Sequence, residues 1–447
     1  MNELIEQNRR EYGADYARLR FVDEQTAQRA RQKRAELLQR LGPDGCGTAG
    51  GSKVHSGPLS PGCRQCIEGR WSCLFINGRC NAACFYCPTR QDELGDPTTN
   101  TVPFHTPQDY VDYVAAFGFG GVSLSGGEPL LTPDRSLAYL DAVKKRFGST
   151  IHTWLYTNGI LVNERILKQL RDAGLDEIRF DIGATGYRLD RAQLAVGIIP
   201  TVTVEVPAVP EEKERLAGLL VPMAEAGINH LNLHQLRLTP HNLPQLVSRG
   251  YHFLHGKKVT VLESELCALE LVAISAARHG VPVNYCSFVY KNRYQHCAAR
   301  TRNARFAAKG WEEMTATGYL RTLTLHGSAE QLRSLNQTLK DREEAPDSFA
   351  LNRAGDRLQL HPRLLPTLEL QGLDLLVSYV EAAQLPAVTY RHPFFQVRVN
   401  DRKAIIIERR ELVRDYNLGP ASNYGNSPLP GELCDFETLP SGLADYF

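Results

Sequence analysis

Apolar and polar positions alternate in a repeating way from about residue 70 to residue 310 of this 447-residue chain. Short runs rich in Val, Ile, Leu and aromatic residues predict strands, and longer segments with apolar residues at helical spacing lie between them. Six strand–helix units in series indicate a parallel sheet with crossover helices, so we expect an α/β fold built on a partial (βα)6 TIM-like barrel. The expected strands are 73–76, 121–125, 152–157, 177–182, 201–206 and 230–234, and the expected helices are 107–117, 135–147, 163–173 and 211–226.

The two ends of the chain follow other patterns. Residues 2–42 predict one or two polar helices, and a connection rich in Gly, Ser and Pro follows them. After residue 310 the pattern predicts a strand at 320–327, helices at 329–340 and 372–384, and a hairpin over 394–407 that turns at Asn400-Asp401. The expected domains are therefore an N-terminal helical extension with its connection (1–60), a barrel with a cysteine metal loop (61–310) and a C-terminal α+β domain (311–447).

Charge and hydropathy argue against several classes of protein. Lys and Arg number 51 against 50 Asp and Glu, and this balance gives no basic surface of the kind that nucleic acids or anionic membranes attract. No apolar run approaches the roughly 18 residues of a membrane span, and the charged N-terminus is unlike a signal peptide. We therefore expect a cytoplasmic protein without nucleic-acid or membrane partners. In that reducing compartment, eleven cysteines indicate metal or redox chemistry rather than disulfides.

Three cysteines lie within eight residues of the segment GRCNAACFYCPTR (78–90), namely Cys80, Cys84 and Cys87. A C-x3-C-x2-C loop at the end of the first strand can supply three thiolates to an iron–sulfur cluster, because cysteine is the usual ligand of such clusters. The fourth iron would then stay open for a small molecule. Phe85 and Tyr86 would keep the cluster partly dry. A zinc site with a fourth ligand elsewhere in the chain is the alternative.

Together with two further motifs, this loop resembles the signature of the radical S-adenosylmethionine (SAM) superfamily. SLSGGEPLL (123–131) follows the second expected strand, and YTNG (156–159) follows the third. The resemblance implies an oxygen-sensitive enzyme in which Cys80, Cys84 and Cys87 hold a catalytic 4Fe–4S cluster. The open iron would bind SAM, and an electron from a donor such as flavodoxin or ferredoxin would cleave it to methionine and a 5′-deoxyadenosyl radical. The residues that the resemblance places at SAM are Tyr86, Ser125, Gly126, Gly127, Glu128, Asn158, Asp181 and Glu205. His234 follows the sixth expected strand and should line the open end of the barrel, where it either reaches SAM or substrate or is a hydrogen-bonded rim group.

A second cysteine group, Cys63-x2-Cys66-x6-Cys73, precedes the first. A C-x2-C pair in a Gly-flanked loop is a common half-site for zinc or iron. The segment resembles pyruvate formate-lyase-activating enzymes and the cobalamin-dependent radical SAM enzyme that C-methylates an arginine of methyl-coenzyme M reductase, which implies an auxiliary metal at Cys63, Cys66 and Cys286. Cys73 and Cys297 compete for the fourth position, and a helix over 286–297 would favour Cys73 because it separates its ends by roughly 16 Å. Ordinary buried thiols and a second iron–sulfur cluster stay open as alternatives.

Several other residues have less specific patterns. Cys46, Cys267, Cys297 and Cys434 fit the behaviour of small buried hydrophobic residues. Lys291 and Gln295 follow the expected metal loop at Cys286, and they predict either a carboxylate-binding group or a solvated helix face.

No motif in the sequence identifies the substrate. The expected reaction is hydrogen abstraction that modifies a protein or peptide, by activation or by C-methylation. A radical SAM enzyme acting on a small molecule is one alternative, and a structural metal-binding interaction module without SAM chemistry is another. No D-x-H-x-x-G cobalamin motif occurs in the chain, so a cobalamin would have to bind in the C-terminal domain.

Overall fold

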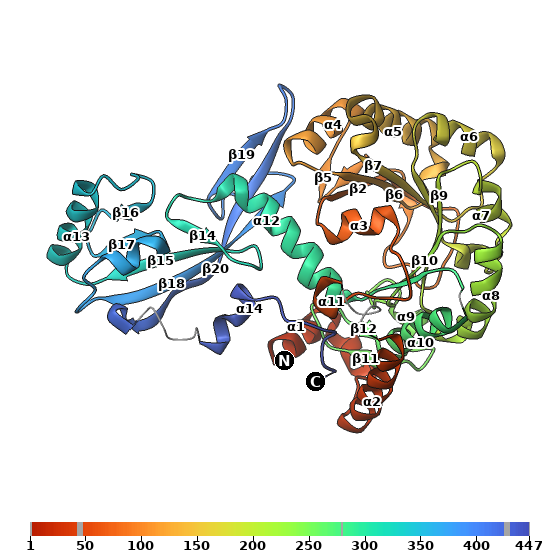
Figure 1. Ribbon diagram of the computed structural model, residues 1–447, viewed down its shortest axis with the longest axis horizontal. Coiled ribbons are helices and arrows are strands. Elements are labelled where there is room, and N and C mark those ends of the chain that lie inside the picture. The colour runs from red at the N-terminus through yellow and green to blue at the C-terminus, as the bar shows by residue number, and fades with distance from the viewer. Residues whose placement is uncertain (1, 43–47, 279, 424–429, 447) are drawn as a thin grey trace. The chain divides into compact units, whose positions relative to one another are not determined.

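The structure is a computed structural model that describes residues 2–42, 48–278, 280–423 and 430–446. Its contacts divide the chain into two compact units, which Figure 1 shows as a barrel and a smaller sheet. The first unit comprises Met1–Thr99, Pro103–Gln295 and Pro440–Phe447, and the second comprises Asn100–Val102 and His296–Leu439. Within the described residues, no helix has the length and apolar character needed to cross a membrane.

Seven parallel strands form the centre of the first unit. All six expected strands are present, and the sequence pattern missed the seventh, at Val283–Cys286, which pairs with the strand His230–His234. The α/β class with a partial TIM-like barrel is therefore confirmed, with one strand more than expected. In sheet order the strands are β13 (Val283–Cys286), β10 (His230–His234), β9 (Thr201–Pro207), β8 (Glu177–Phe180), β7 (His152–Thr157), β6 (Gly121–Gly126) and β2 (Trp71–Arg79).

Helices cover the outside of this sheet, as Figure 1 shows. In α6 (Glu164–Asp172), the Asn163 side chain accepts the Ile166 N–H at the first turn, and Ile166, Leu167 and Leu170 are buried on one face. Local capping and a helical apolar stripe thus place the helix against the strands. The other covering helices are α4 (Pro107–Ala116), α5 (Pro133–Phe147), α7 (Asp190–Ala195), α8 (Lys213–Glu225) and α10 (Leu262–Arg278).

The N-terminal part of the first unit contains the polar helices α1 (Asn2–Tyr12) and α2 (Glu24–Leu41), as expected. The short strand β1 (Val54–His55) then pairs antiparallel with β13. It leads into α3 (Pro61–Ile67), which begins where the Ser60 hydroxyl accepts the Cys63 N–H. The Gly62 N–H donates to Glu177, the first residue of β8, at 3.0 Å. Helix α3 therefore lies at the amino ends of the barrel strands and carries Cys63 and Cys66.

The second unit is an antiparallel sheet with helices α12 (His296–Ala307) and α13 (Ala329–Asp341). The expected strand at 320–327, helix at 329–340 and hairpin over 394–407 are confirmed. The strands in sheet order are β16 (Phe349–Leu351), β17 (Arg357–Leu360), β15 (Leu320–His326), β18 (Asp374–Leu385), β20 (Ala404–Pro420) and β19 (Phe394–Arg398), with β14 (Glu312–Met314) beside β15.

The expected helix at 372–384 is wrong, because this segment forms β18. Leu373, Leu375, Val377 and Tyr379 alternate along it and are all buried in the core of the second unit. The strand pairs with β15 on one edge and with β20 on the other, and the side chains of Leu376, Val380 and Ala382 on its second face are buried as well. A strand buried on both faces gives a nearly continuous apolar run, and such a run resembles a buried helix in sequence.

Candidate active site

The loop that follows β2 carries the three closely spaced cysteines. The Cys80 N–H donates to the Gln91 carbonyl at 3.1 Å, and the Cys87 N–H donates to the Cys84 carbonyl at 3.0 Å, which closes a turn around the thiols. Burial raises the pKa of Cys84 to about 11, and the neighbouring Asp181 carboxylate acts in the same direction. The free Cys84 thiol is therefore protonated at neutral pH, so a metal that binds it must displace a proton.

Two nitrogen donors point at the Cys80 sulfur. The Ala82 N–H lies 3.4 Å from it, and the Asn158 amide nitrogen lies 3.6 Å from it. The same amide donates to the Asn81 side-chain oxygen at 2.7 Å, which fixes its direction. Hydrogen bonds to sulfur stabilise a ligated thiolate and tune a cluster. The donor set of this loop thus fits an iron–sulfur cluster.

The end of β6 comes very close to the end of β2. A Cβ atom on Gly126, which has φ +141°, would lie 2.2 Å from the Asn77 carbonyl oxygen, and one on Gly127 would lie 2.1 Å from that of Arg79. The Gly127 N–H donates to Asn77 at 2.9 Å, and the Glu128 N–H donates to Arg79 at 2.7 Å. Glycine is required at both positions, and the glycine motif is tied directly to the cysteine loop.

The Glu128 carboxylate holds the next loop in place. It accepts the Asn158 N–H at 2.7 Å, and both the Thr157 hydroxyl and the Leu130 N–H at 2.9 Å. Burial raises the pKa of Glu128, although these bonds favour its charged form. This carboxylate is fully buried and already bonded within the protein. Its structural effect is to fix the YTNG turn beside the cysteine loop.

The aromatic residues of the cysteine loop are fixed from two sides. The Tyr86 hydroxyl donates to the two Asp181 carboxylate oxygens at 2.9 and 3.0 Å, and burial raises the pKa of Asp181 to about 6. The Arg249 guanidinium lies 3.7 Å from the centre of the Phe85 ring. Tyr86 thus connects the loop to the end of β8.

A network of buried charges fills the barrel interior. Arg179 donates to Glu177 at 2.8 Å and to Glu205 at 2.7 Å, and its side chain is 4% exposed. Glu205 also accepts the Asn232 amide at 2.9 Å and forms a short hydrogen bond with His234. Arg179 and the hydrogen bonds keep the pKa of Glu205 well below its usual range, against the opposing effect of burial. The two residues expected to face SAM on β9 and β10 are therefore bonded to each other.

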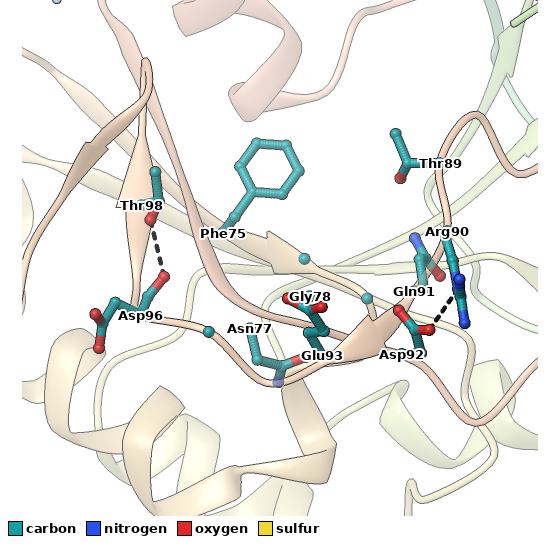
Figure 2. A pocket seen from close by; sticks show the side chains of 13 residues that line it. Phe75, Asn77, Gly78, Thr89, Arg90, Gln91, Asp92, Glu93, Asp96 and Thr98 are labelled. Atoms are coloured by element: carbon teal, nitrogen blue, oxygen red, sulfur yellow. Dashed lines mark hydrogen bonds and ion pairs between the residues drawn. The ribbon is translucent and has the colours of Figure 1, made fainter. Parts of the chain in front are cut away.

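The expected SAM-binding residues come from the carboxyl ends of consecutive strands, which is where a barrel places its active site. Gly126 and Gly127 help to line a cavity of about 520 Å³. Figure 2 shows other residues that line it. Arg90 forms an ion pair with Asp92 in this cavity, and the Thr98 hydroxyl donates to the Asp96 carbonyl at 2.8 Å. The lining also includes Glu93. The cavity therefore has the carboxylates of Asp92, Glu93 and Asp96 against the guanidinium of Arg90, and this excess of negative charge favours a polar ligand with positive charge.

Cys63, Cys66 and Cys286 come together inside the barrel from α3 and β13. The Asn284 amide nitrogen lies 3.6 Å from the Cys63 sulfur and 3.4 Å from the Cys286 sulfur, so those sulfurs are at most 7.0 Å apart. The Gln295 amide nitrogen bonds the Cys66 sulfur. Among the described residues, no three or more His, Cys, Asp or Glu side chains are grouped so as to hold a metal ion as they stand. A single ion would therefore need these thiols to move inward.

Lys53, which belongs to no sequence motif, lies among these thiols. Its side chain is completely buried, and its ammonium lies 3.0 Å from the Cys286 sulfur and 4.3 Å from the centre of the Tyr290 ring. Burial lowers the pKa of Lys53, but the thiol sulfurs raise it by more, so the net direction is upward. The sequence contains one indication that Lys53 has a special role: it is the only Lys, Arg, Asp or Glu between Asp44 and Arg64.

The two residues that compete for a fourth ligand position differ in their surroundings. Cys73 faces the barrel interior, where the Ser123 and Ser125 hydroxyls lie beside its thiol. Cys297 belongs to the second unit, and its thiol donates to the Ala316 carbonyl at 3.2 Å. The chain is helical from Phe288 onward, so the helix begins soon after Cys286.

The other weakly patterned residues fall in different places. Cys267 is buried and Cys434 is exposed, so the expectation of burial is wrong for Cys434, while Cys46 lies outside the described residues. Lys291 donates to the His234 ring at 3.1 Å, and the Gln295 amide reaches Cys66. The interpretation as a solvated helix face is therefore wrong for these two side chains.

Comparison with known proteins also indicates a radical SAM enzyme. Residues 74–192 match the sequence profile of the radical SAM superfamily. A Methanocaldococcus jannaschii protein named as a glycyl-radical enzyme activating enzyme is 30% identical over 301 residues, which cover 64% of this chain and 78% of that protein. The GTP 3′,8-cyclase of Lactiplantibacillus plantarum is 29% identical over 123 residues, or 26% of this chain and 34% of the cyclase.

Among solved structures, Streptococcus suis SuiB bound to S-adenosylmethionine superposes with a TM-score of 0.36 at 12% identity, over 52% of this chain and 56% of SuiB. The family assignment rests on the matched profile and on the Methanocaldococcus relative, whose length this chain covers by more than two thirds. The chain belongs to the radical SAM superfamily, and it is an enzyme that uses a 4Fe–4S cluster and S-adenosylmethionine.

Proposed function

We propose that this radical SAM enzyme abstracts hydrogen from a protein or peptide substrate, as an activating enzyme for a glycyl-radical partner. The observation that carries the proposal is the similarity to the Methanocaldococcus protein, which extends over 301 residues. The similarity to a small-molecule cyclase covers only 123 residues. A SAM-cleaving core shared by the two proteins is enough to explain a similarity of that length.

Cys80, Cys84 and Cys87 are the proposed cluster ligands. The two N–H donors aimed at the Cys80 sulfur and the turn that brings the three thiols together support this assignment. When bound, the cluster supplies the electron that splits SAM into methionine and a 5′-deoxyadenosyl radical. Tyr86 and its neighbour Phe85, held by Asp181 and Arg249, would limit the access of water to the loop.

The proposed SAM site is built from the carboxyl ends of β6 to β10. Ser125, Gly126 and Gly127 would bind SAM through the exposed backbone at the end of β6, and Asn158 would lie between this backbone and the cluster loop. Glu128 would act by holding Asn158 in position, since its carboxylate already bonds that residue's N–H. The remaining members of the proposed site are Asp181, Glu205 and His234.

An auxiliary iron or zinc is the second proposed cofactor, with Cys63, Cys66 and Cys286 as ligands. Three thiols in one buried region are a suitable donor set for either metal. The Asn284 side-chain oxygen, buried between β10 and β1, has no hydrogen-bond partner among the described residues, which is consistent with a missing ligand nearby. The sequence favours Cys73 over Cys297 as the fourth ligand, and replacing Cys73 by Ser tests this choice.

We further infer that the enzyme works in the cytoplasm and takes its electron from a flavodoxin or ferredoxin. All ten described cysteines are free thiols, which suits a reducing compartment. An external electron donor is required because SAM cleavage consumes an electron that neither SAM nor the substrate supplies.

The test uses anaerobically reconstituted protein with a chemical reductant and SAM. Wild-type protein should release 5′-deoxyadenosine, and addition of a glycyl-radical enzyme as substrate should produce an organic radical detectable by paramagnetic resonance. Cys84→Ala should abolish both, whereas Cys434→Ala, which removes an exposed thiol in the second unit, should change neither. Release of 5′-deoxyadenosine without any protein radical would refute the proposed substrate class.

A further inference from the structure

Lys53 is a buried cation whose charge no carboxylate compensates. Its side chain is completely buried, yet no Asp or Glu lies within ion-pair distance of its ammonium in the part of the chain that the structure describes. Its contacts are the Cys286 sulfur at 3.0 Å and the face of the Tyr290 ring. A buried charge is costly unless an opposite charge or strong hydrogen bonds accompany it. The compensating charge must therefore come from the thiols.

The carboxylates of the barrel interior already have cationic partners. Glu177 and Glu205 both accept hydrogen bonds from Arg179, at 2.8 and 2.7 Å. Glu177 also bonds the His152 ring at 3.1 Å, and Glu205 bonds the His234 ring. Arg179 and Lys291, whose ammonium lies 3.1 Å from the His234 ring, supply two positive charges that match the two carboxylates of this network, which leaves Lys53 with the thiols alone.

Counting charges limits how many thiolates the site can hold. Three thiolates around one divalent ion leave a net charge of −1, which the single positive charge of Lys53 neutralises. Four thiolates would leave −2, and half of that charge would stay uncompensated in a buried region. Lys291 does not supply the difference, because its positive charge is matched by the negative charge of Glu205, which bonds the same His234 ring.

We propose that Lys53 is the charge partner of a three-thiolate metal site formed by Cys63, Cys66 and Cys286, and that its charge replaces a fourth thiolate. The inference rests on the auxiliary metal of the proposed function and changes its ligand set. The fourth position then belongs to a nitrogen or oxygen donor. Cys73, whose thiol lies beside the Ser123 and Ser125 hydroxyls, stays outside the site.

The experiment uses full-length protein with its cluster reconstituted and the auxiliary site loaded with zinc. X-ray absorption at the zinc edge counts sulfur neighbours without interference from iron, and competition with a chromophoric chelator gives the zinc affinity. We expect three sulfurs at about 2.3 Å in wild type and in Cys73→Ser. Lys53→Met should weaken zinc binding by at least about 100-fold, the size expected when one partner of a buried charge pair is removed. The control Lys291→Met, which removes a neighbouring cation, should bind zinc as wild type does.

Each other outcome overturns the inference in a distinguishable way. Four sulfurs in wild type that fall to three in Cys73→Ser would show that Cys73 is the fourth ligand, and the auxiliary site itself would stand. Unchanged zinc affinity in folded Lys53→Met, or equal loss in Lys291→Met, would remove the special role of Lys53. A cluster with full iron and sulfide content but no bound zinc would refute the auxiliary site and the inference with it. If Lys53→Met does not fold, the sulfur count in Cys73→Ser decides.

Discussion

Replacing Glu177 by Gln removes one negative charge from the floor of the barrel. The Glu177 side chain has no exposed surface and accepts hydrogen bonds from Arg179 at 2.8 Å and from Thr203 at 2.9 Å. It also accepts the Gly62 N–H at 3.0 Å, which fastens α3 to the barrel. The variant keeps the shape of the side chain and leaves Arg179 with a single carboxylate partner.

The expected loss of stability follows from the pKa of this carboxyl group. Arg179 and His152 hold the pKa of Glu177 at about 2, against an ordinary value of 4.5 and despite the opposing effect of burial. Each pKa unit corresponds to 1.36 kcal/mol, so the charged form contributes roughly 3 kcal/mol. Because the pKa is lowered on folding, this stability is present above pH 4.5 and is lost as the pH falls toward 2. Removal of one partner from a buried pair costs about the same amount.

Urea unfolding followed by tryptophan fluorescence measures this difference. Trp154 is a suitable reporter because its ring centre lies 5.1 Å from the Arg179 guanidinium carbon, and Trp311→Phe would remove the signal of the second unit. The free energy of unfolding of Glu177→Gln should be lower by about 3 kcal/mol at neutral pH, and the difference should shrink below pH 4.5. Glu164→Gln, which breaks an exposed pair with Lys168, should cost only about 0.3–0.5 kcal/mol. A difference under about 1 kcal/mol, or one that does not change with pH, would refute the reasoning.

Three further predictions test other parts of the structure. Cys63→Ala should leave the iron and sulfide of the catalytic cluster unchanged and remove only the auxiliary metal, whereas Cys84→Ala should remove the cluster; equal loss of cluster in both variants would mean that the two cysteine sets are not separate sites. Gly127→Ala should weaken SAM binding, measured by equilibrium dialysis, because its Cβ would lie 2.1 Å from the Arg79 carbonyl oxygen, while Gly218→Ala, with no neighbour within 4 Å, should bind SAM normally. Arg409→Met should destabilise the second unit by about 3 kcal/mol, because it leaves the buried Glu312 carboxylate without the partner that donates at 2.9 Å. Trp311 fluorescence during urea unfolding measures that loss, and an unchanged midpoint would contradict it.

The sequence predicted most of the barrel because each of its elements has a local pattern. The strands before the cysteine, glycine and YTNG motifs are short apolar runs with clear boundaries, and all were located correctly. β13 was missed because it has only four residues, of which Asn284 and Cys286 face the barrel interior. β18 was taken for a helix because its two pairing partners, β15 and β20, lie far from it in sequence, and burial on both faces hides the strand period.

The candidate site also contains residues that the sequence predicted and contacts that it could not predict. The cysteine, glycine and YTNG motifs are contiguous in sequence, so their residues could be named without a structure. The contact of Lys53 with Cys286 and that of Lys291 with His234 could not be predicted, because each contact joins elements that are distant in sequence. The bonding of Glu205 to Arg179 and His234 was likewise invisible, since each residue comes from a different strand of the sheet.

The most direct test of the central claim is the low-temperature paramagnetic resonance spectrum of the reduced, anaerobic protein before and after SAM is added. Wild-type protein should show a reduced 4Fe–4S cluster whose spectrum changes when SAM binds, and Cys84→Ala should show no such cluster. A cluster spectrum that SAM leaves unchanged would contradict a SAM site at Cys80, Cys84 and Cys87.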